Sequence, residues 1–261
     1  MKDVALVIVS CDAYKDTWPY FFACFTKFWP DCYIKKYIVT NELAPTYNDI
    51  NVILSGEEKS WSSKMRYALG QISEDIIILL LDDYFICKKV ENNEIEKTIE
   101  RFIEYQYDYL RLMPIPKVSK KRNGIYELDG KNLYEINLQA SVWRKSYLLR
   151  VLRHDGLSAW QVEAMQKVSS PYRIMGNVAA ANYPIIDYLN GIIQGKWYPS
   201  TVKKMKKLNI FINTSQRGIM SFKAILTRNI KIFIMHNINI PIVVRLKNIL
   251  KFFGFKFVTE N

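Results

Sequence analysis

The sequence predicts an α/β fold with a mainly parallel sheet flanked by helices. Val4–Ser10 and Ile76–Leu81 are continuous apolar runs, which are typical of parallel strands buried on both faces. Segments with helical apolar spacing alternate with these strands, as in α/β proteins. The 261 residues, 49% of them hydrophobic and 14% aromatic, provide enough material for a large core. This composition excludes a disordered or fibrous chain.

The first half of the chain reads as a regular alternation. After the strand at Val4–Ser10, aromatic residues at helical spacing predict a helix over Asp16–Phe28. Strands are expected at Tyr33–Thr40 and Asn51–Leu54, followed by a helix over Trp61–Ile72. The order of these elements is that of repeated βα units.

The pattern continues through a central strand and then becomes less regular. Ile76–Leu81 stops abruptly at Asp82-Asp83, and a helix with one apolar stripe is expected over Asn93–Tyr105. Beyond Tyr107 we expect strands at Asp108–Met113 and Leu133–Trp143, a helix around Tyr147–Leu152, and short pieces of unassigned type at Ile185–Tyr188 and Gly191–Trp197.

The net charge divides the chain into two parts. The formal charge is +12, of which +11 falls from Ser200 onward, so residues 1–199 are nearly neutral. We therefore predict a body over residues 1–199 and a basic amphipathic helical tail over residues 200–261. Apolar stripes are expected in helices over Phe222–Phe233 and after Pro241. Basic helices of this kind lie in anionic membrane interfaces, and packing on the body or at a homodimer contact is the alternative.

The cysteine, histidine and hydropathy patterns indicate which metal sites and which cellular compartment to expect. The four cysteines form no CxxC pair and the sequence has only two histidines, so we expect no Cys/His zinc site. The apolar run at Val4–Val9 is shorter than the roughly 7–15 residues of a secretion signal. No window reaches the roughly 18 apolar residues of a membrane span. We expect reduced thiols and a cytoplasmic protein.

Asp82 and Asp83 are the strongest candidates for chemistry. They end the most apolar strand, and the carboxyl edge of an open α/β sheet is where ligands bind. Adjacent carboxylates repel each other unless a cation or hydrogen-bond donors compensate. Mg²⁺ or Mn²⁺ does so and also bridges to a diphosphate. The alternative is that an aspartate merely caps the next element.

Other candidate residues lie in shorter motifs. In SAWQVE, Glu163 stands near Trp160, whose ring can desolvate a carboxylate and raise its pKa, as suits a general base; a surface Glu at a helix start is the alternative. In NGIIQGKWYP, Lys196 and Trp197 follow Gly195, so this loop either closes over a phosphate or is anchored to the core by its tryptophan. At the ends of the first two strands, Ser10, Asp12 and Glu42 are placed to reach a nucleotide or to cap a helix.

Several motifs are absent. The sequence has no GxGxxG after the first strand, no GxxxxGK[ST] and no GxSxG. These absences argue against a dinucleotide fold, a P-loop and a hydrolase elbow. A bound phosphate would be held by a metal and by scattered side chains.

Taken together and in order, SCD, the Trp-Ser helix, LLLDDYF, LQASVWRKSYLL, AWQVE and GKW resemble bacterial glycosyltransferases of the GT-A fold. More narrowly, they are similar to enzymes of capsule and O-antigen biosynthesis. The resemblance runs from Lys2 to Pro199 and leaves out the tail. It implies transfer of a sugar from a nucleoside diphosphate, UDP being expected, to a hydroxyl of a lipid-linked glycan.

The resemblance also implies roles for individual residues. Asp82 and Asp83 would hold a divalent metal on the donor diphosphate, although the spacing is DD rather than DxD, which leaves open which of them binds the metal. Glu163 would be the base of an inverting enzyme. The remaining implied contacts are to the donor for Ser10, Asp12, Glu42, Trp61, Asp82 and Lys196, and to the acceptor for Trp160 and Trp197, the last with a structural role as its alternative.

Two other functions remain open from the sequence. A nucleic-acid-binding protein would use the basic tail, but the tail lacks a recognised nucleic-acid motif and its aromatics are phenylalanines within apolar stripes. A nucleotidyltransferase also uses strand-end carboxylates with a metal. It usually needs a glycine-rich, cationic loop after the first strand, and SCDAYKDTW contains no glycine. We expect an enzyme on the inner face of a membrane, with no nucleic-acid partner.

Overall fold

The computed structural model describes residues 3–57, 59–115, 125–128, 135–167 and 169–237. The chain divides into two compact units, Met1–Gly191 and Ile192–Asn261. This division falls before Ile192, whereas the charge pattern predicts a boundary between Pro199 and Ser200. The GKW motif therefore belongs to the second unit. Among the described residues, no helix has both the length and the apolar character needed to cross a bilayer.

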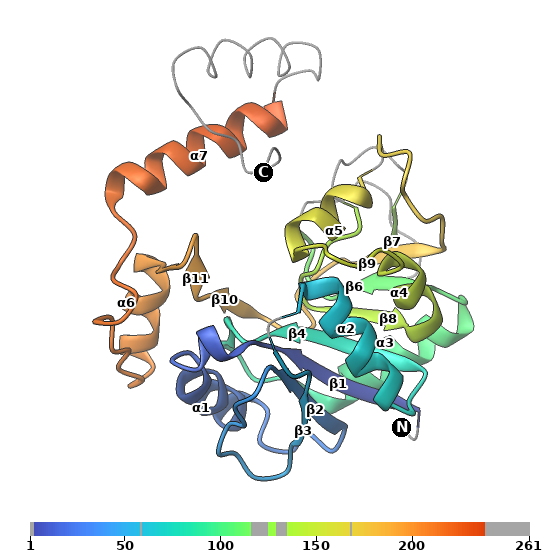
Figure 1. The fold of residues 1–261 in the computed structure, drawn as a ribbon, viewed down its shortest axis with the longest axis horizontal. Helices are drawn as coiled ribbons and strands as arrows, with labels where there is room; N and C mark the ends of the chain where they lie inside the picture. Colours follow the sequence, from blue (N-terminus) through green and yellow to red (C-terminus); the bar gives the residue numbers. More distant parts are fainter. Residues whose placement is uncertain (1–2, 58, 116–124, 129–134, 168, 238–261) are drawn as a thin grey trace. The chain divides into compact units, whose positions relative to one another are not determined.

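The first unit is built on an eight-stranded mixed sheet, in the order β3-β2-β1-β4-β8-β6-β9-β7 (Figure 1). The pairs β3–β2, β2–β1, β1–β4 and β6–β9 are parallel, while β8 runs antiparallel to β4 and β6, and β7 to β9. A mainly parallel sheet confirms the predicted fold class. The strands are β1 Val4–Val9, β2 Lys35–Thr40, β3 Asn51–Leu54, β4 Ile76–Leu81, β6 Tyr109–Arg111, β7 Ile125–Glu127, β8 Ser141–Arg144 and β9 Val178–Ala181.

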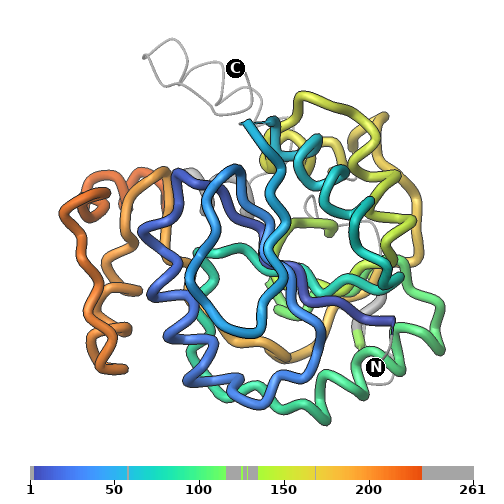
Figure 2. Tube along the Cα trace, turned by 60° about the horizontal axis from the view of Figure 1, so that its bottom comes forward, coloured from blue at the N-terminus to red at the C-terminus, as the bar shows by residue number. Residues whose placement is uncertain are grey.

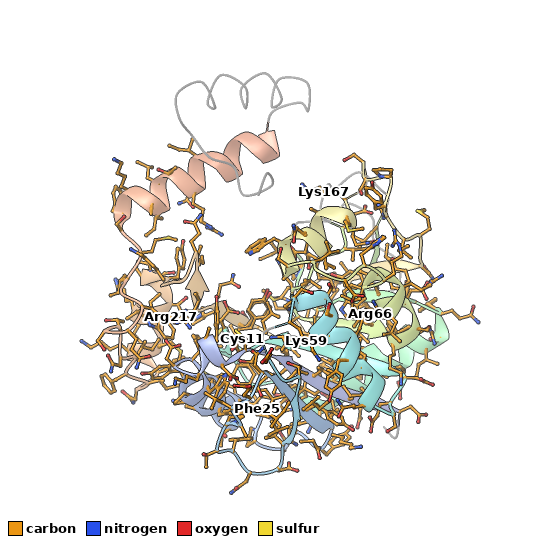
Figure 3. The ribbon with its side chains drawn as sticks, in the orientation of Figure 1. Cys11, Phe25, Lys59, Arg66, Lys167 and Arg217 are labelled. Carbon is orange, nitrogen blue, oxygen red and sulfur yellow. The ribbon has the colours of Figure 1, made fainter. Side chains whose placement is uncertain are left out.

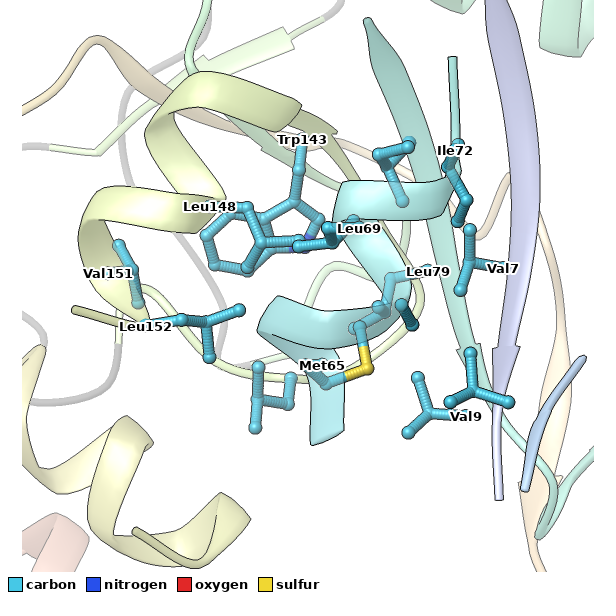
Figure 4. Close-up of a cluster of buried hydrophobic side chains, with 14 of the residues drawn as sticks. Val7, Val9, Met65, Leu69, Ile72, Leu79, Trp143, Leu148, Val151 and Leu152 are labelled. Carbon is cyan, nitrogen blue, oxygen red and sulfur yellow. The ribbon is translucent and has the colours of Figure 1, made fainter. Parts of the chain in front are cut away.

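One face of the sheet is covered by the helices that follow β3 and β8. A buried cluster joins Val7 and Val9 of β1 and Leu79 of β4 to Met65 of α2 and Trp143 of β8 (Figure 4). Burial of this apolar area stabilises the fold at about 25 cal/mol per Å². The helices on this side are α2 Trp61–Gln71, α4 Lys145–Val151 and α5 Ala159–Met165.

The other face is covered by α1 (Trp18–Phe28) and α3 (Asn92–Glu104), as Figures 1 and 2 show. Because side chains alternate along a strand, the buried Leu6 and Ile8 of β1 point to this side. The two helices are linked where Trp29 Nε1 donates to Asn92 Oδ1 at 2.8 Å. Burial on both faces explains why the strands read as uninterrupted apolar runs.

The predicted strand over Leu133–Trp143 is wrong in its first part. Only Ser141–Arg144 forms strand β8, and residues 135–140 are not in a strand; Leu133 and Tyr134 lie outside the described residues. Side chains take the backbone N–H groups that a neighbouring strand would otherwise bind. Asn137 N–H donates to Tyr109 Oη at 3.3 Å and Leu138 N–H donates to Glu163 Oε1 at 2.7 Å.

A short two-stranded sheet fixes the loop that follows β4. Strand β5 (Tyr84–Ile86) pairs antiparallel with β10 (Tyr188–Asn190), and Gly191 N–H donates to Asp83 O at 2.7 Å. A Cβ at Gly191 would overlap the buried ring of Phe85 and lie 3.1 Å from Asp83 O. Glycine at this position therefore permits the close approach that holds the Asp83 backbone.

We expect Gly191→Ala to destabilise the first unit by about 1–3 kcal/mol, because Phe85 is fully buried and has no space to move. Gly70→Ala is the matched control, since Gly70 lies in helix α2 with no atom within 4 Å of the added Cβ. That control should stabilise by about 0.5–1 kcal/mol. Chemical unfolding of both variants measures the difference, and equal unfolding midpoints would contradict the assignment.

In the second unit, the described residues up to Asn237 form a hairpin and two helices. Strands β11 (Ile192–Ile193) and β12 (Lys196–Trp197) are joined by Gln194 and Gly195, both with positive φ, at 52° and 73°. A two-residue turn of this kind is a tight hairpin connection, not a loose loop. Helices α6 (Pro199–Lys207) and α7 (Phe222–Asn237) follow. The predicted helix over Phe222–Phe233 is confirmed, and the one from Pro241 lies outside the described residues.

Candidate functional site

The candidate site lies at the carboxyl edge of the parallel strands. Ser10 follows β1, Asn41 follows β2 and Asp82 follows β4. The chain leaves β1 toward β2 on one side, while β4 lies on the other side, so β1 and β4 flank a switch point of the topology. Ligands of open α/β sheets bind at such points. Figure 3 marks Cys11 at this edge.

Asp82 is buried and held by hydroxyl groups. Its Oδ2 accepts a hydrogen bond from Ser10 Oγ, and Ser10 Oγ in turn accepts one from Trp18 Nε1 at 2.6 Å. Thr17 Oγ1 lies 3.4 Å from the same carboxylate oxygen. The hydroxyl of Ser10 thus positions Asp82, and its predicted contact with a donor stays a prediction. Donors to one carboxylate oxygen offset part of the cost of burying the charge.

Lys64 brings a buried cation to the same place. It lies in the first turns of α2, and its ammonium donates to the backbone carbonyl of Ser10. Burial raises the pKa of the Cys11 thiol, while the positive charge of Lys64 lowers it and the negative charge of Asp82 raises it. Lys64 and Asp82 therefore both act on the segment just after β1. A buried ammonium at this edge can meet an anionic group.

Asp12 joins the ends of β1 and β2. Its carboxylate accepts backbone hydrogen bonds from Asn41 at 3.1 Å, from Glu42 at 3.0 Å and from Leu43 at 3.2 Å. Beside this junction is a hollow of about 380 Å³, whose lining residues are Cys11, Asp12, Ala13, Asn41, Glu42 and Glu57. The volume falls within the range of small-ligand sites. Asp12 shapes the hollow, and its direct contact with a nucleoside stays a prediction, as does that of Glu42.

Asn41, which lines this hollow, has a buried side-chain donor without a partner among the described residues. The side chain is buried, and its Oδ1 accepts from Asp12 N–H at 3.3 Å, which fixes the amide orientation. Among the described residues, Asn41 Nδ2 has no hydrogen-bond acceptor. A buried donor without a partner costs about 1–3 kcal/mol, so a ligand oxygen or ring nitrogen would stabilise it.

Glu163 lies in α5 with a desolvated carboxylate. Ser158 and Gln161 form a capping box that starts this helix. Burial raises the pKa of Glu163, and the hydrogen bond from Leu138 N–H partly opposes that rise. The sequence pattern attributes a raised pKa of Glu163 to Trp160, but Trp160 is exposed and is not the cause. Other side chains line the space beside Glu163, namely Ile136, Asn137, Leu138, Trp143, Val151, Val162 and Gln166.

The hydroxyl of Tyr84 is influenced by the charge of Glu163 and by that of one member of the aspartate pair. It follows Asp83 directly, is buried, and stacks on Tyr188 with ring centroids 4.2 Å apart. Burial raises the pKa of Tyr84, and the negative charges of Asp83 and Glu163 raise it further. Both carboxylates therefore lie within electrostatic reach of one buried hydroxyl. Their joint role as metal ligand and base stays a prediction.

The remaining predicted residues have different settings. Trp160 is 72% exposed on α5, which leaves its ring open to a ligand. Trp61 opens α2, is half-buried and packs against the core cluster. In the second unit, Lys196 is exposed, whereas Trp197 is fully buried and its backbone pairs with Gly218 and Met220. This burial corrects the acceptor-stacking alternative for Trp197, since a ring without exposed surface stacks on no ligand.

The aspartate pair fits a metal that arrives with its ligand. Among the described residues, no group of three His, Cys, Asp or Glu side chains is placed to hold a metal ion. Asp82 Oδ2 already accepts from Ser10, and Asp83 is only half-buried. Mg²⁺ commonly uses one or two carboxylates together with substrate phosphates. Asp83, with Asp82 behind it, fits that mode of binding better than a resident metal.

Lys64, Asn41, Thr17 and Trp18 were not predicted as site residues. For Lys64 a signal was present: it stands three residues after Trp61, on the stripe that also carries Met65 and Ala68, and a lysine on a buried helix face is uncommon. Asn41 directly precedes the predicted Glu42. Thr17 and Trp18 depend on the path of the chain after β1, which carries no comparable signal.

Comparisons with known proteins found architectural likenesses only. No protein-family model matches the chain, and no curated protein matches it. Among solved structures, S. aureus TarS 1-349 is 10% identical with a TM-score of 0.45, over 71% of this chain and 59% of that one. HddC from Yersinia pseudotuberculosis is 13% identical with a TM-score of 0.48, over 78% and 99% of the two chains.

A third likeness is to UDP-glucose pyrophosphorylase complexed with UDP-glucose, at 9% identity and a TM-score of 0.47, over 71% of this chain and 92% of that one. The chain thus spans less than two thirds of the TarS fragment. With TM-scores below 0.5, these likenesses carry no conclusion about activity.

Proposed function

We propose that this chain is a metal-dependent glycosyltransferase of the capsule and O-antigen type that moves a sugar from a nucleoside-diphosphate sugar to an acceptor hydroxyl. One observation carries the proposal: the buried Asp82 and the half-buried Asp83 follow β4 at the same sheet edge as Ser10 after β1 and Asn41 after β2. Glu163, whose pKa is raised by burial, would provide the base. The adjacent hollow of about 380 Å³ supports binding of a nucleoside.

The donor would occupy the carboxyl edge in three parts. Its base and ribose would enter the hollow that Asn41 lines. Its diphosphate would lie near Lys64 and Asp83. Its sugar would then be directed toward Tyr84 and Glu163. UDP is the nucleotide that the sequence resemblance favours.

The proposed reaction is an inverting displacement. Glu163 accepts the proton of the attacking acceptor hydroxyl as the new bond to the sugar C1 forms and the bond from C1 to the diphosphate breaks. A positioned general base contributes roughly 10²–10⁴-fold. A divalent cation, Mn²⁺ or Mg²⁺, would supply charge stabilisation for the departing diphosphate when it is bound at Asp83. Lys64 would add a second positive charge at the same edge.

The acceptor would approach from the side of α5. The exposed ring of Trp160 stands three residues from Glu163 on this helix, and such a ring can stack on a sugar face. We propose a lipid-linked glycan as the acceptor, which would place the enzyme on the inner face of the cytoplasmic membrane. Lys196 belongs to the second unit, and its contact with a donor phosphate stays a prediction from the sequence.

A screen of nucleotide sugars tests the proposed activity. We expect a UDP-sugar with Mn²⁺ to raise the melting temperature and to be hydrolysed slowly without an acceptor. Stabilisation by nucleoside triphosphates and not by nucleotide sugars would instead indicate a nucleotidyltransferase. Stabilisation by neither class would remove the support for a nucleotide site at this edge.

Lys64→Met should weaken UDP binding by about 10- to 100-fold, because it removes a charged hydrogen-bond donor worth about 1.5–3 kcal/mol. Methionine fills similar space, but the buried carbonyl of Ser10 loses its donor, so folding stability should fall by about 1–3 kcal/mol. Lys36→Met is the matched control: Lys36 is similarly buried, but its ammonium binds the carbonyls of Cys32 and Ile34 and forms an ion pair with Asp49 at 2.7 Å. Calorimetric titration with UDP measures the effect, and equal affinities for both variants would exclude Lys64 from the donor site.

A further inference from the structure

Helix α7 carries an apolar stripe that is exposed to solvent. Phe222, Leu226 and Ile230 are 80%, 49% and 50% exposed. Their four-residue spacing places them on one face of the helix. None of residues 222–230 is buried. Residues 222–230 of α7 therefore contribute no fully buried side chain to a core.

A helix with this surface requires a partner to be stable. A 16-residue helix is only marginally stable in water without tertiary packing. Contiguous exposed apolar side chains, here from Phe222 to Ile230, mark an interaction surface. The chemistry of the partner can be read from the charges that surround the stripe.

All charged residues of the described part of the second unit are basic. Between Ile192 and Asn237 the sequence has nine Lys or Arg residues and no Asp or Glu. Lys223 is exposed on α7, and Arg228 of α7 lies over the ring of Tyr198, 5.9 Å from its centroid, beside the start of α6. Helix α6 adds four exposed lysines, Lys203, Lys204, Lys206 and Lys207. The partner must therefore be both apolar and anionic.

Other occupants meet this requirement less well. A second copy of the chain would bring its own nine positive charges to the contact, and like charges repel across an interface. Residues 238–261 carry four basic residues and one acidic residue, so they add positive charge as well. Nucleic acid is anionic, but Phe222 is the single ring of the stripe, and Leu226 and Ile230 offer no ring on which successive bases can stack.

We propose that the second unit binds the surface of an anionic lipid bilayer through α7 and α6. Phe222, Leu226 and Ile230 enter the boundary between headgroups and acyl chains, and the lysines of α6 contact the headgroups, as in other interfacial basic helices. This assignment does not depend on the sugar-transfer reaction. It extends the membrane prediction made for residues 200–261 to a defined helix face.

Vesicle sedimentation of the full chain tests the proposal. Wild type should pellet with vesicles of equal parts phosphatidylcholine and phosphatidylglycerol, and not with phosphatidylcholine alone. Leu226→Ser/Ile230→Ser should weaken partitioning on the order of 10- to 100-fold through lost apolar burial. Replacing the four lysines of α6 by serine should weaken it about fivefold per lysine, as expected for charges near an anionic surface.

A matched control comes from the first unit. Leu54 and Ile103 are similarly exposed there, so Leu54→Ser/Ile103→Ser removes comparable apolar area and should leave partitioning unchanged. Unfolding midpoints of the variants show whether each remains folded. The proposal is overturned if wild type does not pellet with the acidic vesicles, or if the α7 variant pellets like the control. It is also overturned if the α7 variant only converts a dimer to a monomer, or if salt-sensitive RNA binding replaces vesicle binding.

Discussion

Glu163→Gln should lower the rate of sugar transfer by about 10²- to 10⁴-fold, the contribution of a positioned general base. Glutamine keeps an oxygen that accepts the hydrogen bond from Leu138 N–H, so the loop after residue 135 should keep its conformation. UDP affinity should remain close to that of wild type, because Glu163 would contact the acceptor side. Steady-state transfer and UDP titration on the same preparation separate these two effects.

The stability of this variant provides a second readout. Burial raises the pKa of Glu163 in the folded state, so folding favours its protonated form. Wild type therefore loses stability as the pH rises from the ordinary glutamate pKa through the raised folded value. Glu163→Gln removes this loss and should unfold at a higher denaturant concentration than wild type at neutral pH. At a pH below the ordinary glutamate pKa the two proteins should be equally stable.

The raised pKa also predicts the pH dependence of transfer. Only ionised Glu163 can accept a proton, so the rate should fall as the pH decreases through a value above that of a free glutamate. If Glu163→Gln kept most of the wild-type rate, Glu163 would be a capping residue for Leu138 and not the base. Glu163→Ala tests the structural role of Glu163, since it leaves Leu138 N–H without this acceptor. It should lower the stability of the fold by about 1–3 kcal/mol.

The sequence predicted the regular half of the fold because its signals were local. Val4–Val9 and Ile76–Leu81 are buried on both faces, which forces nearly uninterrupted apolar residues. Residues 135–140 were mispredicted as strand because they are equally buried, although their N–H groups bind side chains distant in the sequence. Strand β9 (Val178–Ala181) is not predicted from the sequence, because it consists of a valine followed by three alanines and alanine has no strand preference.

For the candidate site, the sequence predicted which residues belong to the site better than it predicted the role of each residue. Asp82 and Glu163 were chosen from their position after a strand and on a helix. The desolvation of Glu163 arises from residues around Leu138 and not from Trp160, and this depends on tertiary packing alone. In the same way Ser10 proves to be the donor to Asp82. Such contacts between side chains up to 72 positions apart leave no periodic trace in a sequence.

The two aspartates should respond differently to neutralisation, although they are adjacent. Asp83→Asn should lower the transfer rate on the order of 10²- to 10³-fold and weaken the dependence of UDP binding on Mn²⁺, because a bound metal contributes several kcal/mol of charge stabilisation. Asp83 is half-buried, and its backbone carbonyl holds Gly191 whatever the side chain is. The unfolding midpoint of this variant should therefore stay near that of wild type.

Asp82→Asn should instead act first on folding. Its Oδ2 accepts from Ser10 in a buried setting, and an amide there weakens that contact and those that depend on it. We expect destabilisation of about 1–3 kcal/mol. UDP titrations with and without Mn²⁺, paired with unfolding curves, compare the two variants directly. A Mn²⁺ dependence that survives Asp83→Asn and disappears in a folded Asp82→Asn variant would reverse the roles, with Asp82 as the metal ligand and Asp83 as its support.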